Sequence, residues 1–190
     1  AITKQLNKGI IFSLPHPLEV EVSELLHEII PCAEMVRFSK TGSEVCSAAV
    51  KAARAYTGRE MIAYCGYHGW HDFYSIITDK PKGIPQAYKQ YIHPFIYNNI
   101  GSLETLFNIY DKRIACVIME PITFTPPKDD FLQKVQFLCR KNGTVLIFDE
   151  MVTGFRLDIG GAQAYFGVTP DLATFGKGMA NGMPLAAVVG

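Results

Sequence analysis

The chain has 190 residues, of which 48% are hydrophobic and 19% are charged, and its formal net charge is zero. This balance is typical of a single globular domain with a sizeable core and excludes a disordered chain. A neutral chain has no general attraction to nucleic acid or to an anionic membrane, and no apolar run approaches the ~18 residues that a membrane span needs. We therefore expect no nucleic-acid partner and no membrane partner.

The five cysteines are odd in number and irregularly spaced, and several lie inside apolar segments. This usage indicates reduced, mostly buried thiols and favours a cytoplasmic protein. Cys65, His68 and His71 follow one another at three-residue spacing, as metal ligands can, but a fourth ligand is missing. We predict no metal site.

Short apolar runs alternate with segments of helical periodicity along the chain. The patterns predict, in order, a strand at 35–38, a helix at 44–56, strands at 61–65 and 91–97, a helix at 103–110, a strand at 115–119, a helix at 130–141, and strands at 144–148, 172–175 and 185–189. Asn142-Gly143 ends the last helix as a left-handed cap would. The central strands are continuously apolar, so both faces of a mostly parallel sheet should be covered by helices.

Ligands of such sheets lie beyond the carboxyl ends of the strands. After the first strand, Gly42 and Ser43 open a helix, where free backbone N–H groups and the helix dipole attract an anion. The alternative is an ordinary helix cap made by Thr41 or Ser43. After the second strand, Tyr67 and His68 lie near glycines and could stack on a flat ring, unless they only form a turn with a half-buried aromatic group.

Two carboxylates and one lysine follow later strands. Glu120 and Asp149 each come at the end of a buried strand, where a carboxylate needs a partner. For Asp149 that partner would be a protonated ring nitrogen or, alternatively, a structural salt bridge, for example to Arg156. Lys177 stands in a glycine-rich apolar turn. There the loss of water would favour a neutral amine that attacks an aldehyde, unless the lysine is simply exposed on a loop.

Six segments in order resemble the class III aminotransferases, which are pyridoxal-phosphate (PLP) enzymes of fold type I. The resemblance runs from about residue 35 to 190, is most specific at 146–177, and within the family favours glutamate-1-semialdehyde aminomutase. The segments are Thr41-Gly42-Ser43-Glu44, Tyr67-His68-Gly69, Glu120-Pro121, Asp149-Glu150-Met151-Val152-Thr153-Gly154-Phe155-Arg156, Pro170-Asp171-Leu172 and Gly176-Lys177.

The resemblance implies that residues 1–190 form the PLP-binding large domain, a three-layer αβα unit with a mostly parallel seven-stranded sheet. We expect the N- and C-terminal parts of the family to be absent. The cofactor would be PLP, Lys177 would bind it as a Schiff base and shuttle protons, and Asp149 would keep the ring nitrogen protonated.

The resemblance also implies that Gly42 and Ser43 bind the phosphate, that Tyr67 stacks on one ring face and that Met151 covers the other. Glu120 and His68 would lie behind the residues that touch the cofactor and would hold those residues in place. The partners would be a small-molecule amino donor, a carbonyl acceptor and a second subunit in a homodimer.

Three functions stay open on the sequence. The first is an aminotransferase, the second is a 2,1-aminomutase of the glutamate-1-semialdehyde type, and the third is a non-catalytic fragment that binds PLP. Residues 120–127 lack the glycine-rich stretch expected of the family at this place, so the substrate also stays open.

Overall fold

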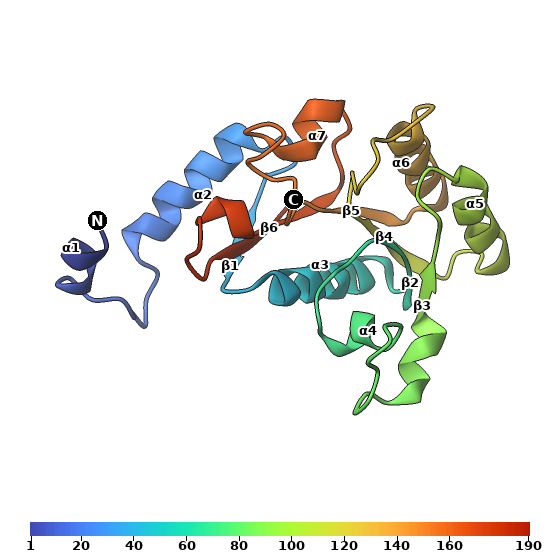
Figure 1. The fold of residues 1–190 in the computed structure, drawn as a ribbon, viewed down its shortest axis with the longest axis horizontal. Helices are drawn as coiled ribbons and strands as arrows, with labels where there is room; N and C mark the ends of the chain where they lie inside the picture. Colours follow the sequence, from blue (N-terminus) through green and yellow to red (C-terminus); the bar gives the residue numbers. More distant parts are fainter.

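In the computed structural model, which describes residues 1–190, seven strands form one sheet in the order β1-β7-β6-β5-β4-β2-β3 (Figure 1). Only β7 runs antiparallel to its neighbours, so the predicted, mostly parallel α/β sheet is confirmed. The strands are β1 (Val36–Ser39), β2 (Met61–Cys65), β3 (Ile92–Pro94), β4 (Ile114–Met119), β5 (Val145–Asp149), β6 (Leu172–Phe175) and β7 (Ala186–Val189).

Helices cover both faces of the sheet (Figure 1). The longest, α3 (Gly42–Thr57), crosses one face and contacts five strands, while α5 (Ile100–Ile109) and α6 (Phe131–Asn142) pack together on the other. No helix is both long enough and apolar enough to cross a membrane. The remaining helices are α1 (Ile2–Leu6), α2 (Pro17–Ile29), α4 (Asp72–Ser75), α7 (Gly161–Phe166) and the 3-10 turns η1 (Gln86–Tyr91) and η2 (Lys177–Met179).

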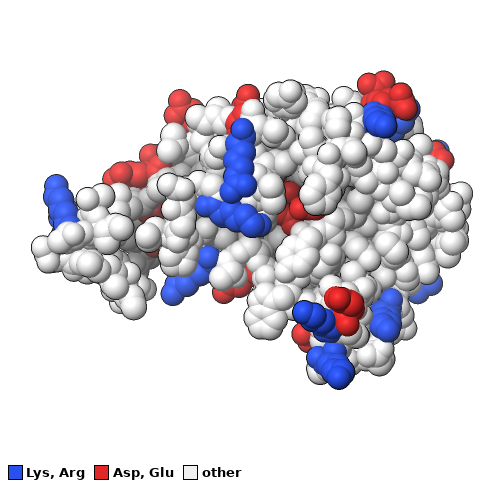
Figure 2. All heavy atoms as spheres, viewed as in Figure 1, with Lys and Arg blue, Asp and Glu red and all other residues white.

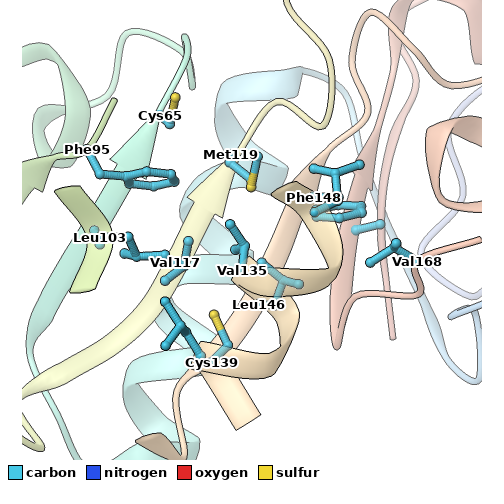
Figure 3. Close-up of a cluster of buried hydrophobic side chains, with 14 of the residues drawn as sticks. Cys65, Phe95, Leu103, Val117, Met119, Val135, Cys139, Leu146, Phe148 and Val168 are labelled. Atoms are coloured by element: carbon cyan, nitrogen blue, oxygen red, sulfur yellow. The ribbon is translucent and has the colours of Figure 1, made fainter. Parts of the chain in front are cut away.

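The two sides of β4 show how the sheet divides the core. Side chains alternate along a strand, so Cys116 and Ile118 join the cluster under α3, and Val117 and Met119 join the cluster under α5 and α6. Figure 3 shows this second cluster, with Val117 and Met119 among side chains from the neighbouring strands and helices. All of β4 is buried, which explains why its sequence is continuously apolar.

Most predicted elements occur within a few residues of their expected places. The helix expected at 44–56 begins at Gly42, because the Thr41 side chain caps it and Glu44 completes a capping box. Gly143 has φ 58°, which confirms the left-handed cap. The strand expected at 91–97 is correct only for Ile92–Pro94, and Pro94 has no N–H with which to extend the ladder.

Four α-helices, α1, α2, α4 and α7, have no counterpart among the predicted elements, and α2 and α7 differ in what starts them. A proline at its first position and a capping box between His16 and Glu19 start α2, and these signals stand in the sequence. By contrast, α7 is short, begins after Gly160 and has no capping side chain of its own. It depends on a contact from another segment.

That contact comes from Glu150, a fully buried carboxylate just after β5. Its oxygens accept hydrogen bonds from the Thr153 hydroxyl and from the backbone N–H groups of Ala162 (2.7 Å) and Gln163 (3.0 Å), in the first turn of α7. Burial raises the pKa of Glu150, and these hydrogen bonds act against the rise. The Gln163 side chain then accepts the N–H of Cys32 at 3.0 Å and ties the end of α2 to the same unit.

We expect the substitution Glu150→Ala to lower the free energy of unfolding by about 2–4 kcal/mol, because it leaves two buried N–H groups and a hydroxyl without an acceptor. Urea denaturation followed by circular dichroism would measure the loss. Glu150→Gln, which retains one acceptor oxygen, should lose clearly less. An unchanged midpoint for the alanine variant would contradict this account of α7.

Candidate functional site

The site lies where five strands end. Because only β7 is reversed, β1, β2, β4, β5 and β6 all point their carboxyl ends to one edge of the sheet. A hollow of about 260 Å³ opens there. Seven of the eight candidate residues line it, namely Gly42, Ser43, Tyr67, Glu120, Asp149, Met151 and Lys177. A larger groove of about 630 Å³ lies beside α2 and contains none of them.

The start of α3 presents free hydrogen-bond donors to this hollow. The Thr41 hydroxyl caps the N–H of Glu44, whereas the N–H groups of Gly42 and Ser43 have no acceptor within the chain. The predicted cap by Thr41 is confirmed, and it leaves these two N–H groups free for the predicted anion. Hydrogen bonds from Ser39 and Thr41 lower the pKa of the Glu44 carboxyl to about 2, and this acid faces the capping turn.

The loop after β2 packs closely against the start of α3. Gly69 has φ +98°, and a Cβ at this position would strike the side chain and the backbone of Ser43. The next residue, Trp70, donates its backbone N–H to the Ser43 oxygen at 3.2 Å. The Ser43 hydroxyl hydrogen thus stays available to a ligand, and glycine is required for the loop to come this near.

At the end of β5, Asp149 is almost completely buried and accepts three hydrogen bonds. The donors are His68 Nδ1 (2.8 Å), Cys46 Sγ (3.5 Å) and the N–H of Met151 (3.1 Å). The alternative of a salt bridge to Arg156 is wrong, because the partner of Asp149 within the chain is His68.

His68 is fully buried and does not line the hollow. Its Nδ1 lies against the carboxylate of Asp149, and its Nε2 has no hydrogen-bond partner. The imidazole therefore lies on the side of Asp149 away from the hollow and is too deeply buried to stack on a ligand there. No group of three His, Cys, Asp or Glu side chains is placed to hold a metal ion.

Lys177 follows β6 and begins the 3-10 turn η2 at the rim of the hollow. Its side chain is exposed, so the expected desolvated setting is absent from this chain; the flanking Gly176 and Gly178 have no side chains to cover it. The backbone of Lys177 is left-handed, with φ +43°. Such a conformation costs about 1–3 kcal/mol for a residue with a side chain and is concentrated at functional sites.

Tyr67 and Glu120 form the wall between β2 and β4. Tyr67 is 58% exposed and lines the hollow, and its ring meets that of Tyr74 in a T-shaped contact at 5.4 Å. The N–H of Tyr67 donates to Glu120 Oε2 at 3.3 Å. Burial raises the pKa of the Glu120 carboxyl, and the hydrogen bond from Tyr67 partly offsets the rise.

Met151 fills a slot between two glycines. A Cβ added at Gly42 would lie 2.8 Å from its Sδ atom, and a Cβ added at Gly176 would lie equally close. Both distances are shorter than any normal contact with sulfur. The two glycines thus allow the thioether to lie between the start of α3 and the turn that carries Lys177.

The sequence analysis did not select several residues that line the hollow. Met183 and Leu185 reach it from the start of β7, and Cys46 reaches it from α3. Cys46 is three residues after Ser43, so it lies on the same helical face, and that spacing was a usable signal. Met183 and Leu185 depend on the reversed direction of β7, which no local pattern shows.

Comparisons with known proteins agree on one family. The sequence profile described as aminotransferase class-III matches residues 1–190. A 3-aminobutyryl-CoA aminotransferase from Cloacimonas acidaminovorans is 42% identical over 197 residues, a match that covers 100% of this chain and 47% of that protein.

Solved structures agree with the sequence match. An omega-transaminase from Sphaerobacter thermophilus has a TM-score of 0.93 and 35% identity, covering 100% of this chain and 48% of that one. The FumI protein of Sphingopyxis sp. MTA144, solved as the PLP internal aldimine form, has a TM-score of 0.90 and 29% identity, covering 99% and 47%. The chain therefore spans about half the length of these relatives.

A glutamate-1-semialdehyde aminomutase from Pseudomonas aeruginosa is also similar, with a TM-score of 0.87 and 22% identity over 99% of this chain and 44% of that one. The predicted likeness to this enzyme is therefore confirmed for the fold, and at this identity it shows the fold alone.

Because Met151 Sδ occupies the space that a Cβ at Gly42 would need, we expect Gly42→Ala to destabilise the chain by about 1–3 kcal/mol. Met151→Val removes the sulfur, so the double variant should recover most of that loss. A double-mutant cycle in urea would measure the coupling energy. Strictly additive effects would show that the slot between the glycines does not constrain Met151.

The raised pKa of Glu120 predicts a pH dependence of stability with a definite sign. The folded chain holds this proton more tightly than the unfolded chain does, so the stabilisation is complete below the ordinary value of 4.5 and is lost as pH rises through the folded pKa. Unfolding free energies of the wild type, relative to Glu120→Gln, should therefore fall over this range. A difference that is constant with pH would contradict the prediction.

Proposed function

The chain belongs to the class III aminotransferase family, and we propose that residues 1–190 are the cofactor-holding large domain of an enzyme that transfers amino groups with PLP. One observation carries the proposal. A helix start with free N–H groups, a buried carboxylate and a lysine surround a single hollow at the carboxyl edge of the sheet.

The residues of the hollow suit the separate parts of PLP. The free N–H groups of Gly42 and Ser43, with the Ser43 hydroxyl, would hold the phosphate at the positive end of α3. The buried carboxylate of Asp149 would pair with the protonated ring nitrogen, which would supply a cationic partner in addition to the hydrogen bond from His68.

The remaining contacts concern the two faces of the ring and the aldehyde. The ring of Tyr67 would stack on one side, and the thioether of Met151 would cover the other. The exposed amine of Lys177 lies on the rim of the hollow and would bind the aldehyde as a Schiff base. A relative of 29% identity, solved as the PLP internal aldimine form, supports this role for a lysine.

When bound, PLP supplies an aldehyde that bonds to amines and a ring that draws electrons from the adjacent carbon. The Lys177 amine, once displaced by an amino substrate, would be placed to take a proton from the carbon that bears the substrate amine and to deliver it to the carbon derived from the PLP aldehyde. The Asp149 carboxylate would hold a proton on the ring nitrogen, and the hydrogen bond from His68 would help to orient that carboxylate. Tyr67 and Met151 would fix the plane of the ring, and so the direction in which the proton moves.

The amino donor we propose carries its amine on a carbon that is not next to a carboxylate, as in 3-aminobutyryl-CoA, whose amine is β to a thioester, and as the name omega-transaminase indicates for a second relative. Within residues 1–190, the cationic side chains that line the hollow are Lys40 and Lys177. The acceptor is a small carbonyl compound. Net consumption of that acceptor would distinguish amino transfer from an aminomutase, which returns the amine to the same molecule.

We further propose a homodimer and a cytoplasmic location. The exposed Tyr67 and Lys177 lie on one open edge, where covering protein from the rest of the enzyme or from a second subunit would supply the dry environment that the chemistry needs. All five cysteines are free, which supports a reducing compartment.

Lys177→Ala should remove both cofactor attachment and turnover. With the wild type, added PLP should give a visible absorption band that borohydride abolishes, and peptide mapping should find the reduced adduct on Lys177. The alanine variant should show neither the band nor the adduct, because no other amine replaces the lost one. Lys40→Ala, which removes the other lysine of the hollow, should leave the adduct on Lys177. An adduct on another lysine in the wild type would refute the role of Lys177.

A further inference from the structure

We infer that Cys46 is a positioning residue for Asp149, whose carboxylate its thiol holds in place by donating a hydrogen bond to Oδ2. The inference rests on the proposed function, because the carboxylate so held is the one proposed to face the ring nitrogen of PLP. Sequence reasoning gave Cys46 only the general character of a buried thiol, and the structure gives it a specific partner.

Three elements bring the contact together. Cys46 lies on α3 and is 1% exposed, and its Sγ is 3.5 Å from Asp149 Oδ2 on β5 and 3.6 Å from Thr174 Oγ1 on β6. Asp149 and Thr174 are direct partners in the parallel ladder of β5 and β6, so their side chains reach α3 side by side. Cys46 also lines the hollow itself.

The chemistry of the three groups fixes the direction of the hydrogen bonds. A carboxylate can only accept, so the thiol hydrogen points to Asp149. The sulfur is then left as an acceptor for the Thr174 hydroxyl, which is fully buried and has no other hydrogen-bond partner in the chain. The Thr174 hydroxyl therefore donates to the sulfur of Cys46, and the thiol of Cys46 donates to the carboxylate of Asp149.

The thiol is suited to donate and not to react. Burial raises the pKa of Cys46 well above its ordinary value, and the nearby Asp149 charge raises it further. A thiol that keeps its proton is a poor nucleophile, and it is the form that can donate a hydrogen bond.

The thiol of Cys46 is the second side-chain donor to Asp149, beside the imidazole of His68. His68 donates from Nδ1 to Oδ2, and its Nε2 has no hydrogen-bond partner. Oδ1 receives only the backbone N–H of Met151, two residues away. With Cys46 on the opposite flank, Oδ2 is held from both α3 and the loop after β2, and the carboxylate keeps one orientation toward the hollow.

The first test is spectroscopic and needs no cofactor. The S–H stretching band of a cysteine falls where other protein groups do not absorb, and a difference infrared spectrum of the wild type minus Cys46→Ala isolates the band of Cys46 from the other four thiols. A thiol bonded to a carboxylate should absorb at lower wavenumber than a free thiol. Asp149→Asn, which removes the charge of the acceptor, should move the band to higher wavenumber.

The second test measures cofactor affinity by following the absorbance of the purified protein as PLP is added. Cys46→Ala and Cys46→Val should each weaken binding about three- to tenfold, the range expected for one lost hydrogen bond. Cys46→Ser, which restores a donor, should return the affinity to within about twofold of the wild type. Valine fills the space of the thiol without a hydrogen to donate, so it separates a packing role from a positioning role.

The outcomes are distinct. An S–H band at the free-thiol position, or a valine variant that binds PLP like the wild type, would overturn the inference. If the wild type itself bound no PLP, the proposed function would fail, while the infrared band would still decide whether the thiol donates to Asp149.

Discussion

The common direction of β1, β2, β4, β5 and β6 is the constraint on which the site depends. Parallel strands bring residues that are far apart in the sequence to one edge, from Gly42 after β1 to Lys177 after β6. The single reversed strand, β7, contributes from its beginning instead of its end. Much of the lining therefore comes from the residues that directly follow a strand, and the rest comes from the start of α3 and from the segment before β7.

A second principle is that every buried carboxylate needs hydrogen-bond donors, and two such carboxylates stand at the end of β5, Asp149 as its last residue and Glu150 directly after it. Asp149 faces α3 and the hollow, and its neighbour Glu150 faces the start of α7 on the other side. Successive residues leave a strand in opposite directions, so one short sequence serves two tasks. Asp149 retains room for a ligand, whereas Glu150 has its oxygens occupied by Thr153, Ala162 and Gln163. The pair joins the hollow to the outer helical layer.

On the surface, Lys, Arg, Asp and Glu side chains are scattered over the face shown in Figure 2, much of which is uncharged.

The sequence was sufficient for features that depend on local pattern. The buried strands, the helix after Thr41 and the cap at Gly143 follow from periodicity and turn chemistry, and the order of strand ends then brought Gly42, Asp149 and Lys177 to one place. Features that depend on distant contacts could not be predicted. The partner of Asp149 is His68, 81 residues away, and not the nearby Arg156. The exposure of Lys177 depends on what covers the edge, and α7 depends on Glu150, so neither has a local signal.

The hydrogen bond between the Trp70 backbone and Ser43 has one more consequence. Trp70 is the only tryptophan in the chain, its indole is 72% exposed, and it follows directly the glycine that packs on the start of α3. The tryptophan fluorescence of this chain, excited selectively over that of its tyrosines, therefore originates from one residue beside the start of α3, where we propose that the phosphate binds. Binding there would change this signal without any added label.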